Sequence, residues 1–280
     1  MINWRTCQEH AEGILASGIY HLKNTPAQNE DWPTAAGNYL ISYRNQPAYI
    51  GEAKNLAHRL AQQANIRTSH FYKNYCSLQS RELPSGLNIG DFPIQVMPHG
   101  FGRKEIEEFG IVDLSVCLNK FQKNKRQKFS ASIDPNLWSA VQSAADKLLH
   151  EGELLLLEQQ AVDWFEAIAP NNSGLYWVEL PSNEVIYVGE SSSIEERYNT
   201  HSSQTYFSAL RRHIGTELLG FTLIQKKGKK RYFTKDQDQA VTNLLRNCKV
   251  RMFPIRLGRY ELETHLIQKY RPILNRKDNY

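Results

Sequence analysis

Residues 174–189 read GLYWVELPSNEVIYVG, and this stretch decides the fold. Tyr176 and Tyr187 are eleven residues apart. That separation suits two adjacent strands joined by a short hairpin. We therefore predict strands over about 175–180 and 184–188.

The same pattern occurs earlier in the chain, where residues 37–51 read GNYLISYRNQPAYIG. Polar residues follow each stretch at matching distances: an arginine comes eight residues after the last glycine, and a glutamate precedes an asparagine by twelve. The first set is Tyr39, Tyr49, Arg59, Glu107 and Asn119, and the second is Tyr176, Tyr187, Arg197, Glu263 and Asn275. A structural repeat explains matched glycines but not matched polar residues, so both sets indicate chemistry.

This pattern resembles the GIY-YIG nuclease superfamily, which is named after its two short strand motifs. The resemblance covers roughly residues 37–119 and 174–275, and the second copy is the closer match. There, His201 follows Arg197 by four residues, and the run from Glu263 to Asn275 contains Leu266-Ile267 and Pro272. The resemblance implies a tandem duplication of a nuclease domain in one chain.

Gly18-Ile19-Tyr20 spells the family motif literally, but it lies 29 residues before Tyr49. Some family members have longer connections at this point, so Tyr20 stays open as an alternative. The short hairpin spacing favours Tyr39.

The expected fold class is α+β (an α/β sandwich). Each of two GIY-YIG-type domains would hold a small, mainly antiparallel three-stranded sheet flanked by helices. We expect an N-terminal helix and linker over 1–36, a first domain over 37–128, a helical bridge over 129–170 and a second domain over 171–280. The segment 135–169 is rich in helix formers and is not Gly/Ser-rich, which favours helices over a flexible linker.

Bulk composition is that of an ordinary globular protein, with 41% hydrophobic and 22% charged residues. No apolar run is long enough to span a bilayer, so we expect no membrane partner. The four cysteines form no Cys-x-x-Cys pair, which argues against a zinc site or a disulfide framework and suggests a reducing cytoplasm. A net charge of +5 permits nucleic-acid binding without requiring it.

Hydrolysis of a phosphodiester needs an activated water and stabilisation of charge on the phosphoryl oxygens. Glu107 and Glu263 are the expected ligands of Mg²⁺ or Mn²⁺, since one carboxylate plus waters and phosphate oxygens suits such an ion. Arg59 and Arg197 can present a planar fork of donors to the scissile phosphate. His201, one helical turn from Arg197, could touch the same phosphate or assist proton transfer.

The resemblance implies that the first tyrosine of each pair, Tyr39 or Tyr176, deprotonates or orients the attacking water, with Tyr49 and Tyr187 in support. A nearby arginine or metal-bound water could lower the tyrosine pKa from about 10. Asn119 and Asn275 would brace the glutamate helix. Contacts to nucleic acid are expected from a basic helix and a basic hairpin, through Arg211, Arg212, Lys227, Lys229, Lys230 and Arg231.

Three functions remain open. The first is a metal-dependent DNA endonuclease that cuts both strands with its two domains, a monomer sufficing as an internal pseudo-dimer, in restriction or phage defence. In the second, only the C-terminal domain cuts and the N-terminal one binds DNA, because Gln63 stands where His201 stands and cannot titrate. The third is a non-catalytic nucleic-acid-binding protein. RNA stays open as a substrate, and target preference cannot be read from the sequence.

Overall fold

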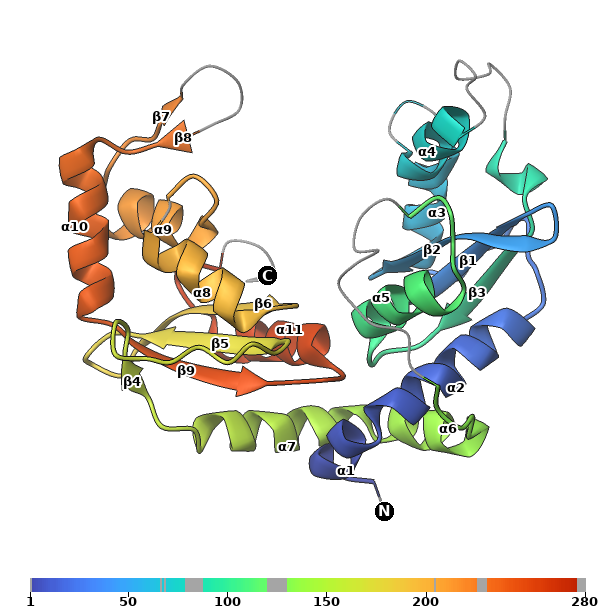
Figure 1. Ribbon diagram of the computed structural model, residues 1–280, viewed down its shortest axis with the longest axis horizontal. Helices are drawn as coiled ribbons and strands as arrows, with labels where there is room; N and C mark the ends of the chain where they lie inside the picture. The colour runs from blue at the N-terminus through green and yellow to red at the C-terminus, as the bar shows by residue number, and fades with distance from the viewer. Residues whose placement is uncertain are drawn as a thin grey trace. The chain divides into compact units, whose positions relative to one another are not determined.

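The computed structural model describes residues 2–65, 67, 69–78, 88–119, 130–203, 205–225 and 231–275. The chain divides into two compact units, Met1–Leu148 (unit 1) and Leu149–Tyr280 (unit 2) (Figure 1). Each is described by itself below.

Unit 1 is built from helices around one small sheet. Its elements are α1 (Trp4–Glu9), α2 (Ala11–Asn24), β1 (Gly37–Tyr43), β2 (Gln46–Ala53), α3 (Leu56–Ala64), α4 (His70–Leu78), the 3-10 turn η1 (Ile89–Asp91), β3 (Ile94–Pro98), α5 (Arg103–Asp113) and α6 (Pro135–Ser143). Helix α7 (Ala145–Leu157) begins at the end of unit 1 and continues into unit 2.

The sheet of unit 1 has the order β2-β1-β3 and is antiparallel throughout. Arg44 and Asn45 both have positive φ, at 51° and 60°, which is the signature of a tight two-residue hairpin. Successive strand residues point to opposite faces. Tyr39 and Ile41 therefore pack in the cluster that includes residues of α3 and α4, and Ile50 lies against Gly110 of α5 on the other face.

Unit 2 repeats this order with an additional segment before its last strand. Its elements are β4 (Val162–Asp163), β5 (Gly174–Glu179), β6 (Val185–Ser191), α8 (Ile194–Ser203), α9 (Ala209–His213), the π-helical turn η2 (Ile214–Leu218), β7 (Ile224–Gln225), β8 (Arg231–Tyr232), α10 (Lys235–Arg246), β9 (Lys249–Pro254) and α11 (Arg259–Tyr270). The sheet order is β4-β9-β5-β6, and β7 pairs only with β8. In Figure 1, α8 and α9 lie on one side of this sheet and α11 on the other.

The two sheets share details of backbone geometry. Tyr39 lies opposite Gly51 in the β1–β2 pair, and Tyr176 lies opposite Gly189 in the β5–β6 pair. A Cβ atom on Gly51 would lie 2.3 Å from the Tyr39 hydroxyl, and one on Gly189 would lie 2.2 Å from the Tyr176 hydroxyl. Only glycine allows either tyrosine to lie across its partner strand in this way.

The expected α+β class, with antiparallel sheets and helices, is confirmed. Two details were wrong. The sheet of unit 2 has a fourth strand, because β4 pairs with β9. The segment 129–170 is therefore not a helical bridge throughout: α7 ends at Leu157, and 162–163 is strand. Within the first 36 residues, α2 continues to Asn24 and buries Ile19 and Leu22. Gly18 and Tyr20 also lie in α2, so Tyr39 holds the strand position.

Candidate active site

The tyrosine pair of unit 2 lies at the centre of the candidate site. The rings of Tyr176 and Tyr187 are stacked, with centroids 6.0 Å apart and planes inclined by 24°. Tyr176 is buried, whereas Tyr187 is half-buried. Burial and the neighbouring Tyr187 raise the pKa of Tyr176 well above its ordinary value, although Arg197 acts in the opposite direction. Arg197 therefore acts in the expected direction, but burial outweighs it.

His201 connects this tyrosine to the start of α9. Its Nε2 lies 3.0 Å from the Tyr176 hydroxyl, and its Nδ1 lies 2.6 Å from Ser208 Oγ. Ser208 Oγ also accepts a hydrogen bond from the backbone N–H of Arg211 and so caps α9. Burial and the charges of Arg197, Arg211 and Arg212 lower the pKa of His201 to about 3. A pKa this low makes the imidazole uncharged and only weakly basic at neutral pH, which favours positioning of the phenol over the expected proton transfer.

Glu263 and Asn275 lie along the outer edge of β6. Asn275 Oδ1 accepts a hydrogen bond from Val188 N at 2.9 Å, and Asn275 Nδ2 donates to Val188 O at 2.7 Å. Two residues further on, Glu190 N donates to Glu263 Oε1 at 2.9 Å. An edge strand presents backbone groups that need partners, and here side chains supply them. Asn275 thus holds the edge strand, and the hydrogen bond from Glu190 N fixes the Glu263 carboxylate next to Gly189 in β6.

Arg197 brings positive charge to the same place. Its guanidinium acts electrostatically on the pKa values of Tyr176, Tyr187 and His201, and Glu263 acts on both tyrosines. Arg197 and Glu263 are both half-buried, so neither is sealed in the core. The structure thus brings together two phenols, an arginine, a carboxylate and an imidazole within one part of unit 2.

Comparison with known families agrees with this geometry. Residues 164–280 match the GIY-YIG catalytic domain. A domain of this family indicates a nuclease acting on nucleic acid. A search of curated proteins found no match to the chain.

In unit 1 several residues of the first set make contacts like those of their counterparts in unit 2. The rings of Tyr39 and Tyr49 are stacked, with centroids 6.2 Å apart and planes inclined by 28°. Gln63 Nε2 donates to the Tyr39 hydroxyl at 3.0 Å, and Gln63 Oε1 accepts from Ser69 Oγ at 2.7 Å. Ser69 Oγ in turn accepts from Tyr72 N at the start of α4. In both units the tyrosine hydroxyl is hydrogen-bonded to an amide or imidazole, which is in turn hydrogen-bonded to a serine before the next helix.

The carboxylate side of unit 1 combines a braced edge strand with a glutamate of raised pKa. Asn119 holds Ile50 as Asn275 holds Val188, with hydrogen bonds of 3.0 and 2.8 Å. Burial, followed by the charges of Glu52 and Glu108, raises the pKa of Glu107 to about 8. Arg59 is half-buried and acts on both tyrosines, as Arg197 does in the GIY-YIG domain.

A second pair of charged residues supports each site. Arg259 Nε donates to Glu190 Oε2 at 2.8 Å, and Arg103 Nη1 lies 3.5 Å from Glu52 Oε2. Both arginines are buried and directly follow a glycine with positive φ, Gly258 or Gly102. The sequence carries a signal for this pair, because Glu52 and Glu190 each follow the motif glycine and Arg103 aligns with Arg259. Ser69 and Ser208 were missed.

The expected nucleic-acid contacts have different outcomes. Arg211 is buried and binds Thr205, Thr242 and Asp238 within the domain, so its assignment to the nucleic-acid surface was wrong. Arg212 is half-buried, and Arg231 is exposed on β8. Lys227, Lys229 and Lys230 lie outside the described residues.

The residues around Glu263 offer few protein ligands to a divalent cation. Among the described residues, no group of three or more His, Cys, Asp or Glu side chains could hold a metal ion. That pattern argues against an all-protein cage. It fits an ion held by one carboxylate, with waters and substrate oxygens as the other ligands, which is common for Mg²⁺. In the described part of the chain, no helix is long and apolar enough to cross a membrane.

Proposed function

We propose that unit 2 is a metal-dependent endonuclease that hydrolyses phosphodiester bonds in DNA. The observation that carries this proposal is the clustering of Tyr176, Tyr187, Arg197 and Glu263 within the matched GIY-YIG domain. These side chains supply what the reaction requires: donors for the phosphoryl oxygens, a ligand for a cation, and hydroxyls beside the attacking water.

Arg197 binds the non-bridging oxygens of the scissile phosphate through its planar guanidinium. Tyr176 stays a neutral phenol at pH 7 because its pKa is raised. Its hydroxyl therefore orients the water by hydrogen bonding and does not act as a phenolate base. The half-buried Tyr187 stacks on Tyr176 and completes the wall of the site. His201 fixes the Tyr176 hydroxyl through Nε2.

Glu263 would hold Mg²⁺ or Mn²⁺, and such an ion supplies Lewis-acid stabilisation of the phosphoryl and leaving oxygens. The hydrogen bond from Glu190 N fixes one oxygen of this carboxylate and so sets the position of the other. Asn275 keeps the edge strand that carries Glu190 in place.

The test is cleavage of supercoiled plasmid DNA with Mg²⁺ or Mn²⁺ by the wild-type chain and the Glu263→Gln variant. Glu195→Gln is the matched control, since Glu195 is an exposed glutamate on α8. We expect Glu263→Gln to abolish cleavage by unit 2. Glu195→Gln should cleave at the wild-type rate. Wild-type activity that persists in excess EDTA would contradict metal dependence. Cleavage of an RNA substrate in place of the plasmid would assign RNA as the substrate.

We further propose that unit 1 is a second copy of this domain, so that one chain cuts both DNA strands, as a restriction or phage-defence enzyme does. The shared Tyr–Gly register, the Gln63–Ser69 chain and the Asn119 contacts support this proposal. We place the protein in a reducing compartment, the cytoplasm, which the free thiols of its four cysteines support.

One observation favours the alternative in which unit 1 only binds DNA. With a pKa of about 8, Glu107 is mostly protonated at pH 7 and is then a weak ligand for a cation. A bound divalent ion would lower this pKa, because it favours the charged form of the carboxyl. The two alternatives therefore differ in whether unit 1 cleaves once the ion is supplied.

A further inference from the structure

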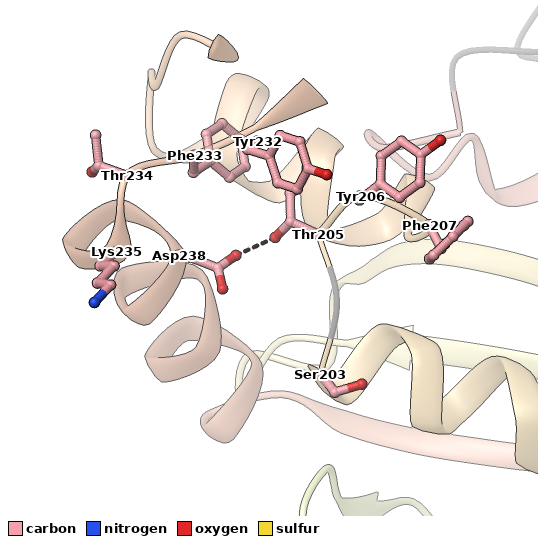
Figure 2. Close-up of a pocket in the computed structure, with 9 residues that line it drawn as sticks. All are labelled: Ser203, Thr205, Tyr206, Phe207, Tyr232, Phe233, Thr234, Lys235 and Asp238. Carbon is pink, nitrogen blue, oxygen red and sulfur yellow. Dashed lines mark hydrogen bonds between the residues drawn. The ribbon is translucent and has the colours of Figure 1, made fainter. Parts of the chain in front are cut away.

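Unit 2 carries three aromatic side chains at its surface that the catalytic cluster does not use. We call Tyr206, Phe207 and Tyr232 the aromatic platform. The rings of Tyr206 and Tyr232 are stacked, with centroids 5.6 Å apart and planes inclined by 18°, and Phe207 meets Tyr206 edge-on at 4.3 Å. Phe207 is 61% exposed, which is unusual for so large an apolar side chain. Figure 2 shows Tyr206 and Tyr232 above Thr205, with Phe207 beyond Tyr206.

Two cavities border the platform, and both are lined by Tyr206 and Phe207. One, of about 410 Å³, extends toward α10 and includes Thr234 and Asp238. The other, of about 540 Å³, adds Arg212, Arg231 and Gln225 to the two aromatic residues. The second cavity thus combines aromatic faces with two positive charges, and none of the described residues that line it is acidic.

The two arginines lie close enough to affect one another. Desolvation and the charge of Arg231 lower the pKa of Arg212. Arg212 Nη1 also donates to the backbone oxygen of Tyr206 at 2.6 Å, which fixes this guanidinium beside the platform. Two like charges held near each other favour an anion between them.

The platform is adjacent to the catalytic cluster in sequence, and the charge of Arg212 beside it acts on that cluster. Tyr206 and Phe207 directly precede Ser208, whose hydroxyl contacts His201. Two residues span at most about 7 Å, so the platform begins close to the Tyr176–His201 pair. The charge of Arg212 also acts on Tyr187 and on His201. A group bound in the second cavity therefore lies near the position expected for the scissile phosphate.

Aromatic faces beside arginines suit one kind of ligand in particular. Bases of single-stranded nucleic acid stack on aromatic side chains, and arginines contact the linking phosphates. A base inside a duplex is stacked on its neighbours and cannot offer a face unless it is extruded. The platform therefore favours an unpaired nucleotide over a paired one.

We propose that the aromatic platform, with Arg212 and Arg231, is a subsite for an unpaired nucleotide that flanks the scissile phosphate. The base stacks on Tyr206 and Phe207, and its phosphate contacts the two guanidiniums. This inference rests on the proposed nuclease function, and it adds that the nucleotide beside the cut is unpaired when bound, either in a single strand or extruded from a duplex.

The test is equilibrium binding, measured by fluorescence anisotropy. EDTA is present so that no cleavage occurs. The probes are a labelled 12-nucleotide DNA, the RNA of the same sequence, and the DNA annealed to its complement. We expect Phe207→Ala to weaken single-strand binding about tenfold and duplex binding less than twofold, since stacking of each base contributes strongly. Phe207→Tyr is the matched control and should keep wild-type affinity. Because Phe207 is exposed, its truncation does not open the core.

Photocross-linking localises the contact independently of unit 1. A DNA 12-mer with 5-iodouracil in place of thymine should cross-link to Tyr206, Phe207 or Tyr232, as mapped by mass spectrometry. The subsite would be overturned if Phe207→Ala lost equal affinity for single strand and duplex, or lost none for the single strand. Cross-links found only at other residues would also overturn it. If the wild type binds and cross-links in this way but cleaves no nucleic acid, the proposed function fails and the subsite stands.

Discussion

Units 1 and 2 hold their first tyrosine in the same way but with different side chains. In unit 1 the amide of Gln63 donates to Tyr39 and accepts from Ser69. In unit 2 the imidazole of His201 lies between Tyr176 and Ser208. A neutral imidazole with its proton on Nε2 has the same polarity as the amide: it donates to the phenol and accepts from the serine. The difference teaches that this position needs a fixed donor, and that it does not need a group that titrates.

Each unit also holds its motif glutamate half-buried near the tyrosine pair. Glu263 accepts a hydrogen bond from the backbone of β6. Desolvation, followed by the charges of Glu52 and Glu108, raises the pKa of Glu107. Unit 2 also has the additional segment from α9 to α10, which carries the aromatic platform. The two units therefore share their tyrosine geometry and differ in the segment that carries the aromatic platform.

The largest expected effect comes from removing an arginine fork. Arg197→Ala should reduce cleavage by unit 2 between about a hundred- and a thousandfold, because a preorganised donor to the phosphate is lost. Arg59→Ala should do the same to unit 1 if that unit cuts. Initial rates on a nicked and a supercoiled plasmid measure this. Arg197→Lys is the control that keeps the charge and loses the planar geometry. Its cleavage rate should lie between those of the wild type and Arg197→Ala.

The next largest expected effect is on the stability of unit 2, from substitution of Glu153 on α7. Its buried carboxylate accepts hydrogen bonds from His265, Lys269 and Tyr270 of α11. Burial alone would raise the pKa of Glu153, but these bonds outweigh it and lower the pKa to about 2. Glu153→Ala should lower the free energy of unfolding of unit 2 by about 2 kcal/mol, because it removes three hydrogen bonds to a buried charged group, although their donors are half-buried or exposed.

The same carboxyl sets a pH dependence. Its folded pKa of about 2 lies below the unfolded value of about 4.3, so the ionised form stabilises the fold above about pH 5. That stability is lost as the pH falls toward 2. Scanning calorimetry from pH 7 to 2 should show a smaller acid-induced fall in the unit 2 transition for Glu153→Gln than for wild type. Identical pH profiles would show that the three hydrogen bonds contribute nothing.

The two motif glycines should behave alike if the units share one geometry. Gly51→Ala and Gly189→Ala each place a methyl group against a tyrosine hydroxyl, at 2.3 and 2.2 Å. We expect each to destabilise its unit by about 1–3 kcal/mol through overpacking and to displace the tyrosine. Thermal unfolding measures this, with Gly100→Ala as control, since nothing lies within 4 Å of a Cβ at that position. A loss in only one unit would break the comparison.

The smallest expected effect is the most informative about His201. His201→Gln should keep unit 2 cleavage within about threefold of wild type, because the amide reproduces the neutral imidazole's hydrogen bonds. His201→Ala should lose considerably more, since the phenol and Ser208 are then unsatisfied. Rates measured from pH 6 to 9 complete the test. A large loss in His201→Gln, with a changed pH profile, would show that His201 transfers a proton.

Much of the fold could be predicted from the sequence because its signals are local. The turn at Arg44 and Asn45 fixed the first hairpin, and Asn55 caps α3 as its side chain suggests. Helix α4 escaped prediction, although Ser69 before an aromatic run is a capping signal. Strand β4 has two residues and exists only through pairing with β9, a contact no local pattern encodes.

The candidate site was predictable in its residues and not in its electrostatics. Matched spacing brought Tyr176, Arg197 and Glu263 together, because these positions follow fixed elements. Neighbouring helix residues point in directions about 100° apart, so the sequence could not say that Arg211 is buried while Arg212 faces the platform. The equivalence of Gln63 and His201 could not be predicted, because it depends on their serine partners. Ser69 and Ser208 each follow the helix that carries Gln63 or His201, and no local pattern pairs them with it.

Product distribution on supercoiled plasmid tests most directly whether the two units form two working sites. The chains compared are wild type, Glu107→Gln, Glu263→Gln and the double variant, with Mg²⁺ or Mn²⁺ at pH 8. The account predicts linear DNA from the wild type, only nicked circles from each single variant, and uncut plasmid from the double variant. Linear DNA from Glu107→Gln at the wild-type rate would contradict it and leave unit 1 as a binding domain.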